Sequence, residues 1–109
     1  MASRPVIERR KEEYAQALEK CSILLVAVGF PSASEKFGLY ARKLRKNPSL
    51  KEIRKICRSV RSCYAGTMGG MTEAYATHAD GSVDREMSHA YEVALQEVWK
   101  YSFPLRWLI

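Results

Sequence analysis

The chain has 109 residues and a formal net charge of +6, and 47% of its residues are hydrophobic and 28% are charged. These values are typical of a globular protein and exclude wholesale disorder, and the length fits one domain over residues 1–109. The longest apolar run, Ile23–Phe30, is too short to span a bilayer. We therefore expect one domain with one hydrophobic core and no membrane span.

The three cysteines, Cys21, Cys57 and Cys63, include no Cys-x-x-Cys pair. Free buried thiols in a reducing compartment are the simplest interpretation, and a Cys57–Cys63 disulfide is the alternative. The run Ile23–Phe30 is similar to the core of a signal peptide, but acidic residues between Glu8 and Glu19 interrupt the region before it. We therefore expect a cytoplasmic protein.

The first predicted helix begins near Pro5, because a proline in the first turn loses no hydrogen bond. Gly29 suits the position just after a helix, and Pro31 forbids continuation. Ile23, Leu24 and Val26 lie off the main apolar stripe, so the last two turns are apolar nearly all round and we expect them to be central in the fold. The stripe itself follows steps of three and four residues and consists of Tyr14, Leu18, Cys21, Leu25 and Val28.

Two capping-box patterns, Ser32–Glu35 and Ser49–Glu52, predict the starts of the second and third helices. The short Asn47-Pro48 link ends the second helix, so the two form a helical hairpin. The buried face of the second helix is predicted to contain Phe37, Tyr40, Ala41 and Leu44. The apolar stripe of the third helix contains Leu50, Ile53, Ile56, Cys57, Val60 and Tyr64.

The segment Ala65–Met71 contains three glycines, so it interrupts the helices. A short helix over Thr72–His78 and a turn at Asp80-Gly81 are predicted next. Ser82 is expected to cap a last long helix that ends before Pro104. The apolar face of that helix contains Val83, Met87, Ala90, Tyr91, Leu95, Val98 and Tyr101.

The sequence has no alternating strand pattern of useful length, and its elements are helical throughout. The apolar tail Leu105–Ile109 is expected to fold back on the helices, because it would otherwise expose an apolar patch to water. We therefore predict an all-α fold, a single-domain bundle of four to five helices with a glycine-rich break after the third helix.

Positive charge is concentrated in Glu35–Arg61, which holds ten Lys or Arg against two acids and has a net charge of +8. Charge that is segregated in this way attracts an anionic partner. A solvated helix face that keeps the protein in solution is the alternative interpretation. The residues that we expect to contact a partner are Arg42, Lys46, Arg54, Arg58 and Arg61.

No recognisable catalytic motif accompanies this charge. The His and acidic residues near the start of the last helix match no metal-ligand spacing: His78, Asp80, Asp84, Glu86 and His89. Asp84 and Glu86 suit the first turn of a helix, where carboxylates offset the helix dipole. The Gly66-x-x-Gly69-Gly70 pattern is neither a Walker A loop nor a dinucleotide fingerprint. We therefore expect no enzymatic activity, no cofactor and no metal.

The stretch Ser62–Thr72 contains Gly69-Gly70-Met71 and resembles a family of short, uncharacterised bacterial helical proteins. Members of that family carry an aromatic-Gly-Gly-Met-Gly-Ser motif after a basic helix. In this chain the aromatic residue is displaced to Tyr64, Thr72 stands where small residues are usual, and the Asn-Asp that follows the motif is missing. The resemblance covers a quarter of the chain and assigns no catalytic residue.

In size and composition the chain is also similar to immunity proteins, which are small, cytosolic and cofactor-free and bind the active-site cleft of an interbacterial toxin. This similarity implies a protein partner. We therefore expect a non-enzymatic binding protein whose basic face docks on the acidic active site of a toxin enzyme. The alternative is a small DNA- or RNA-binding regulator that uses the same face, although the third helix lacks the Asn and Gln that read base edges.

Overall fold

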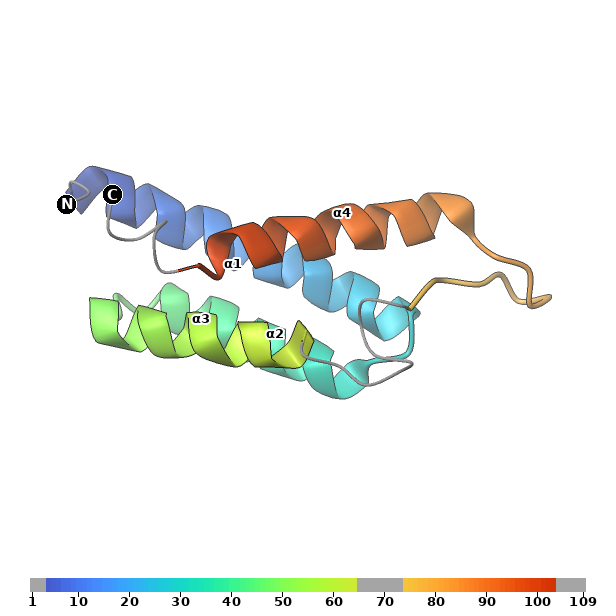
Figure 1. Ribbon diagram of the computed structural model, residues 1–109, viewed down its shortest axis with the longest axis horizontal. Helices are drawn as coiled ribbons and strands as arrows, with labels where there is room; N and C mark the ends of the chain where they lie inside the picture. The colour runs from blue at the N-terminus through green and yellow to red at the C-terminus, as the bar shows by residue number, and fades with distance from the viewer. Residues whose placement is uncertain (1–3, 65–73, 104–109) are drawn as a thin grey trace.

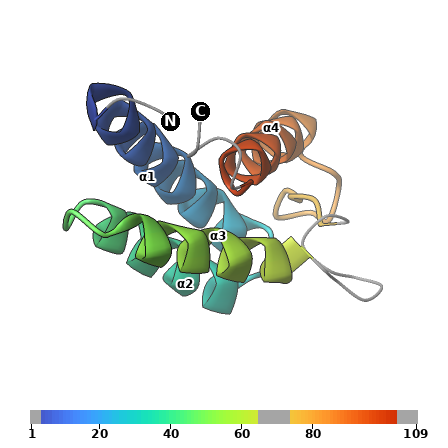
Figure 2. The ribbon, with the colours of Figure 1, turned by 60° about the vertical axis from the view of Figure 1, so that its left-hand side comes forward.

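The computed structural model describes residues 4–64 and 74–103. Within these residues the regular elements are four α-helices, α1 Arg4–Ala27, α2 Pro31–Leu44, α3 Leu50–Tyr64 and α4 Arg85–Tyr101. They form two layers, with α1 and α4 in one layer and α2 and α3 in the other (Figure 1, Figure 2). The predicted all-α bundle is therefore confirmed. The glycine-rich segment Ala65–Met71 and the tail Leu105–Ile109 lie outside the described residues.

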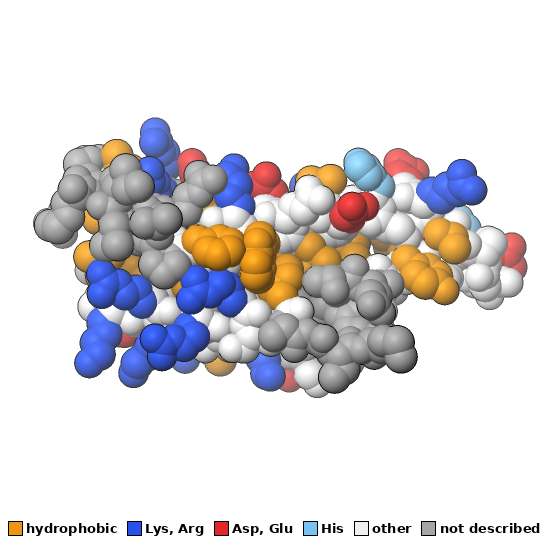
Figure 3. Space-filling view, in the orientation of Figure 1, with side chains coloured by type: hydrophobic (Ala, Val, Ile, Leu, Met, Phe, Trp, Pro, Cys, Tyr) orange, Lys and Arg blue, Asp and Glu red, His pale blue; other side chains and the backbone are white. Residues whose placement is uncertain are grey.

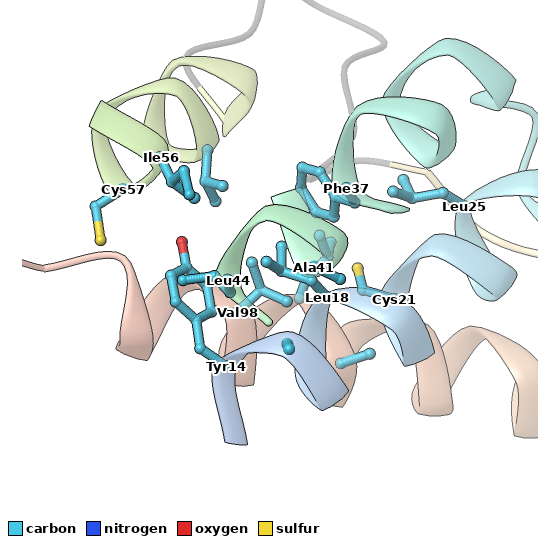
Figure 4. Close-up of a cluster of buried hydrophobic side chains, with 14 of the residues drawn as sticks. Tyr14, Leu18, Cys21, Leu25, Phe37, Ala41, Leu44, Ile56, Cys57 and Val98 are labelled. Atoms are coloured by element: carbon cyan, nitrogen blue, oxygen red, sulfur yellow. The ribbon is translucent and has the colours of Figure 1, made fainter. Parts of the chain in front are cut away.

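One side of every helix contributes to a single core, and α1 packs most extensively against α2 and then against α4. Figure 4 shows Leu18, Ala41 and Val98 pointing into this interior from three different helices. The apolar stripes predicted for α1 and α3 supply most of their buried side chains. The largest fully buried side chains are Tyr14, Leu18, Cys21, Leu25, Phe37, Leu44, Ile53, Cys57, Val60, Tyr91 and Val98.

The end of α1 is set by Gly29, as predicted. Gly29 has a φ of +94°, a conformation that side chains with a Cβ rarely adopt. The Phe30 N–H donates to the Leu25 carbonyl at 2.8 Å, and the Gly29 N–H donates to the Val26 carbonyl at 3.1 Å. This pair of bonds is the Schellman motif, which satisfies carbonyls that the helix end leaves without partners.

The prediction that the last two turns of α1 are central in the fold is wrong. Ile23 is 74% exposed and Val26 is 59% exposed. The principal neighbours of α1 are α2 and α4, which cover its stripe and leave these two side chains in water. The apolar run therefore reflects an exposed patch at the end of α1 rather than a central position in the fold.

The predicted capping box at the start of α2 is also wrong. The helix begins at Pro31, with Phe30 at the N-cap position and no side-chain hydrogen bond there. Ser34 turns instead toward α1, where its hydroxyl donates to the Ser22 carbonyl at 2.7 Å. The Ser22 hydroxyl donates to the Ser34 carbonyl at 2.8 Å, so the two serines join the helices reciprocally. Ser32 therefore lies inside the first turn of α2 and does not cap it, and Ser34 makes a tertiary contact with α1.

Replacing Ser34 with alanine should lower the free energy of unfolding by about 1–2 kcal/mol, because it removes a buried hydrogen bond and leaves the Ser22 groups incompletely paired. Ser32→Ala, at the exposed position that the sequence predicts as the N-cap, should cost less than about 0.5 kcal/mol. Urea denaturation followed by circular dichroism measures both. A larger loss for Ser32→Ala would restore the capping box and contradict the contact with α1.

The second capping box is confirmed at α3. The Ser49 hydroxyl accepts from the Glu52 N–H at 3.2 Å and also contacts the Glu52 carboxylate at 3.4 Å. Asn47, in the link from α2, has a φ of +54°, which asparagine tolerates better than most residues. The link reverses the chain, so α3 runs back beside α2 (Figure 1).

The helix predicted over Thr72–His78 is wrong for its described part, because residues 74–78 are not helical. Thr77 forms an isolated bridge with Val83 instead, closed by the predicted turn at Asp80-Gly81. Ser82 does not cap α4, since its hydroxyl donates to Asp80 within the turn. Asp84 is the cap, and its carboxylate accepts from the Met87 N–H at 3.0 Å.

Candidate docking surface on the third helix

The exposed side of α3 carries a row of arginines. Arg54, Arg58 and Arg61 follow steps of four and three residues, so they share one side of the helix. Arg54 and Arg58 are exposed, while Arg61 is half-buried. Figure 3 shows Lys and Arg side chains gathered over α3, next to a hydrophobic patch between α3 and α4. We call Arg54, Arg58 and Arg61 the arginine row.

Several basic residues elsewhere in the described part of the chain have acidic partners. Arg45 pairs with both Glu12 and Glu19, joining the end of α2 to α1. Hydrogen bonds from its guanidinium lower the pKa of both carboxyls. By contrast, the ion pairs within residues 4–64 and 74–103 do not include Arg54 or Arg58. The charge of these two arginines therefore remains available to a partner.

Arg61 connects the row to the end of α4. Its Nη1 donates to the Ser102 carbonyl at 3.0 Å, and its guanidinium carbon lies 5.6 Å from the centre of the Phe103 ring. This geometry permits a cation–π contact, and it fixes a side chain that would otherwise be mobile in solution. Arg61 therefore contributes to this surface in two ways, because it carries a positive charge and its guanidinium group packs on the ring of Phe103.

The five arginines and lysines predicted as contacts do not form one patch. Lys46 lies on the other flank of α3, in a groove between α2 and α3. Arg42 lies on the part of α2 that is close to Ser22 of α1. A Cβ added to Gly38 would be 3.8 Å from Arg42 Nη1 and 3.8 Å from the Ser22 hydroxyl. The structure therefore brings together only the arginine row, and it separates Arg42 and Lys46 from that row.

An aromatic cluster adjoins the arginine row, and sequence reasoning missed it. Tyr64 and Trp99 have ring centres 4.8 Å apart, and Trp99 meets Phe103 edge to face at 5.0 Å. Trp99 and Phe103 remain 39% and 38% exposed, although they are large apolar side chains. The available signal was the four-residue spacing of Leu95 and Trp99, which places both on one side of α4, with Phe103 following just past the end of that helix.

The aromatic cluster borders an open groove of about 460 Å³. Tyr64, Leu95 and Trp99 form its apolar walls, and Glu92 and Gln96 supply its polar rim. The Tyr64 hydroxyl donates to the Leu95 carbonyl at 2.7 Å. This hydrogen bond and the contact with the Trp99 ring hold the Tyr64 side chain in place. Burial raises the pKa of Tyr64, which therefore stays neutral in the physiological range. The groove is suited to an apolar side chain of a partner rather than to acid–base chemistry.

The polar residues around the turn before α4 serve the local structure. Asp84 caps α4, and His78 Nδ1 lies 3.8 Å from its carboxylate. Asp80 accepts from the N–H and hydroxyl of Ser82, which lowers the pKa of Asp80. Among the described residues, no group of three or more His, Cys, Asp or Glu is placed to hold a metal ion. These contacts agree with the helix-dipole interpretation of Asp84.

The cysteines are free thiols, with Cys21 and Cys57 buried and Cys63 half-buried. Burial raises the pKa of Cys21 to about 12 and also raises the pKa of Cys63. The thiolate, which is the nucleophilic form, is therefore scarce at both positions near neutral pH. The predicted role of Cys21 and Cys57 as core residues is confirmed.

Comparisons with known proteins identify no relative of this chain. No family model matches the chain, and no curated protein or solved structure matches it either. No helix in the described part of the chain has both the length and the apolar character that crossing a membrane requires.

Proposed function

We propose that this protein is a non-enzymatic cytoplasmic binding protein of the immunity type, which neutralises a toxin enzyme by covering its active site. The observation that carries the proposal is the arginine row on α3, whose Arg61 lies over the exposed ring of Phe103, which in turn contacts Trp99. Arg, Trp and Tyr supply most of the affinity at protein interfaces. Because ring contacts already hold the aromatic cluster in place, docking costs little side-chain entropy.

The chemistry of the proposed partner follows from the charge. Enzymes that act on nucleotides or nucleic acids use carboxylates to hold divalent metal ions, so their active sites are rich in negative charge. The planar guanidinium groups of Arg54 and Arg58 can each pair with a carboxylate through two hydrogen bonds. An apolar side chain from the rim of that active site would enter the groove beside Trp99.

A small DNA- or RNA-binding regulator is the second candidate function, and one observation favours it. Trp99 and Phe103 expose aromatic rings next to basic side chains, which is the combination that stacks unpaired bases and neutralises their phosphates. Double-stranded DNA receives less support, since α3 has no Asn or Gln with which to read base edges.

The experiment that tests the proposed function is affinity capture from cells of the source organism, followed by purification of the captured protein. We expect an enzyme whose activity falls to background when the two proteins are mixed at equal concentrations. A captured protein whose activity is unchanged by saturating amounts of this chain would contradict the proposal.

A gel shift separates the two candidate functions. If the regulator function is correct, single-stranded DNA or RNA should be retained at about 50 mM salt and largely released at about 200 mM salt, because phosphate contacts displace counterions. The immunity function predicts no retention of DNA or RNA at either salt concentration. Retention at about 50 mM salt that is lost at about 200 mM salt, together with no effect on any captured enzyme, would favour the regulator.

A further inference from the structure

A second concave surface lies between α2 and α3, on the flank of α3 away from the arginine row. It is an open groove of about 410 Å³. Lys43 of α2, Lys46 just after α2 and Lys55 of α3 line it, and Tyr40 and Ile56 add apolar surface. Three lysines from both sides of the α2–α3 hairpin therefore line one hollow.

Among the described residues, no ion pair includes Lys43, Lys46 or Lys55. Glu52 is the one acidic residue among the described residues that line the groove, and Ser49 holds its carboxylate at the start of α3. A cleft lined by charges of one sign focuses the electrostatic potential and concentrates counter-ions. The groove is therefore a site of positive potential with apolar walls.

We propose that this groove binds the polyphosphate group of a small molecule. Lysine ammonium groups bind phosphates as point charges. Three lysines are therefore suited to an anion in which several negatively charged phosphates are linked in a chain. The half-buried ring of Tyr40 offers a surface for an attached aromatic base. A nucleoside triphosphate and an inorganic polyphosphate share this chemistry. The site is separate from the arginine row, so the inference does not depend on the proposed protein partner.

Isothermal titration at low salt with ATP and with inorganic tripolyphosphate tests the proposal. Two single variants make a matched pair: Lys55→Ala removes a groove lysine, and Lys51→Ala removes an exposed lysine of the same helix that is not among the residues lining the groove. Each variant loses one positive charge. We expect Lys55→Ala to weaken binding about tenfold and Lys51→Ala to weaken it less than about twofold.

The double variant Lys43→Ala/Lys46→Ala should abolish measurable binding, with a circular dichroism spectrum that matches the unaltered protein. Tighter binding of ATP than of tripolyphosphate would identify a nucleotide as the ligand, and equal binding would identify the phosphate chain alone. The proposal is overturned if neither compound binds, or if Lys51→Ala and Lys55→Ala weaken binding equally, since equal losses indicate diffuse surface charge.

Discussion

Replacing Phe37 with alanine should lower the free energy of unfolding by about 3–5 kcal/mol. Phe37 is fully buried on α2, and Figure 4 shows its ring in the same interior as Leu25 and Ala41. Removing the ring loses its burial from water and leaves a cavity, because the helices around it are fixed by many other contacts. The loss is a large fraction of the stability of a domain of this size.

Leu39→Ala is the matched control for this prediction. Leu39 lies two residues further along α2 and is 41% exposed, so its truncation should cost less than about 1 kcal/mol. Urea denaturation followed by circular dichroism gives both values on the same scale. Equal losses at the two positions would mean that α2 does not present Phe37 to the core, and would contradict the packing of α2 on α1.

Reversing the charge of Arg54 and Arg58 to glutamate should weaken binding of the captured toxin enzyme by roughly 3 kcal/mol or more, which is more than a hundredfold in affinity. Both side chains are exposed and outside the ion pairs of the described residues, so the change leaves the fold intact. In the complex, each new carboxylate would face the carboxylates of the partner, and like charges repel across an interface.

The double variant Lys20→Glu/Arg85→Glu changes the net charge by the same amount at exposed positions of α1 and α4. It should leave the affinity within about 0.5 kcal/mol of the unaltered protein, because charges far from an interface are screened by salt. Isothermal titration calorimetry measures both variants. If both weaken binding equally, the net charge of the protein matters rather than the arginine row.

The fold was largely predictable because the helices carry clear local patterns. In α3, apolar residues recur at steps of three and four and Ser49 and Glu52 mark the start, and these signals act within one helix. The start of α2 was not predictable in the same way. Ser32 and Glu35 offered a capping pattern, but α2 begins one residue earlier, at Pro31. The contact of Ser34 with Ser22 depends on how α1 and α2 cross.

The candidate site was predictable only in part. The basic composition of α3 identified Arg54 and Arg58, because both lie opposite the apolar stripe of their own helix. Nothing local indicates that Arg61 meets Phe103, which lies on a different part of the chain. Likewise, the pairing of Arg45 with Glu12 and Glu19 is a property of the packed helices. Which basic residues keep their charge available is therefore decided by tertiary structure.

Hydrogen–deuterium exchange of the protein alone and bound to its partner tests the central claim most directly. The arginine row and the aromatic cluster should form the buried face, so peptides from α3 and from the end of α4 should exchange more slowly in the complex. Protection confined to the exposed end of α1, around Ile23 and Val26, would contradict the claim, because it would place the partner on an apolar surface away from the arginines.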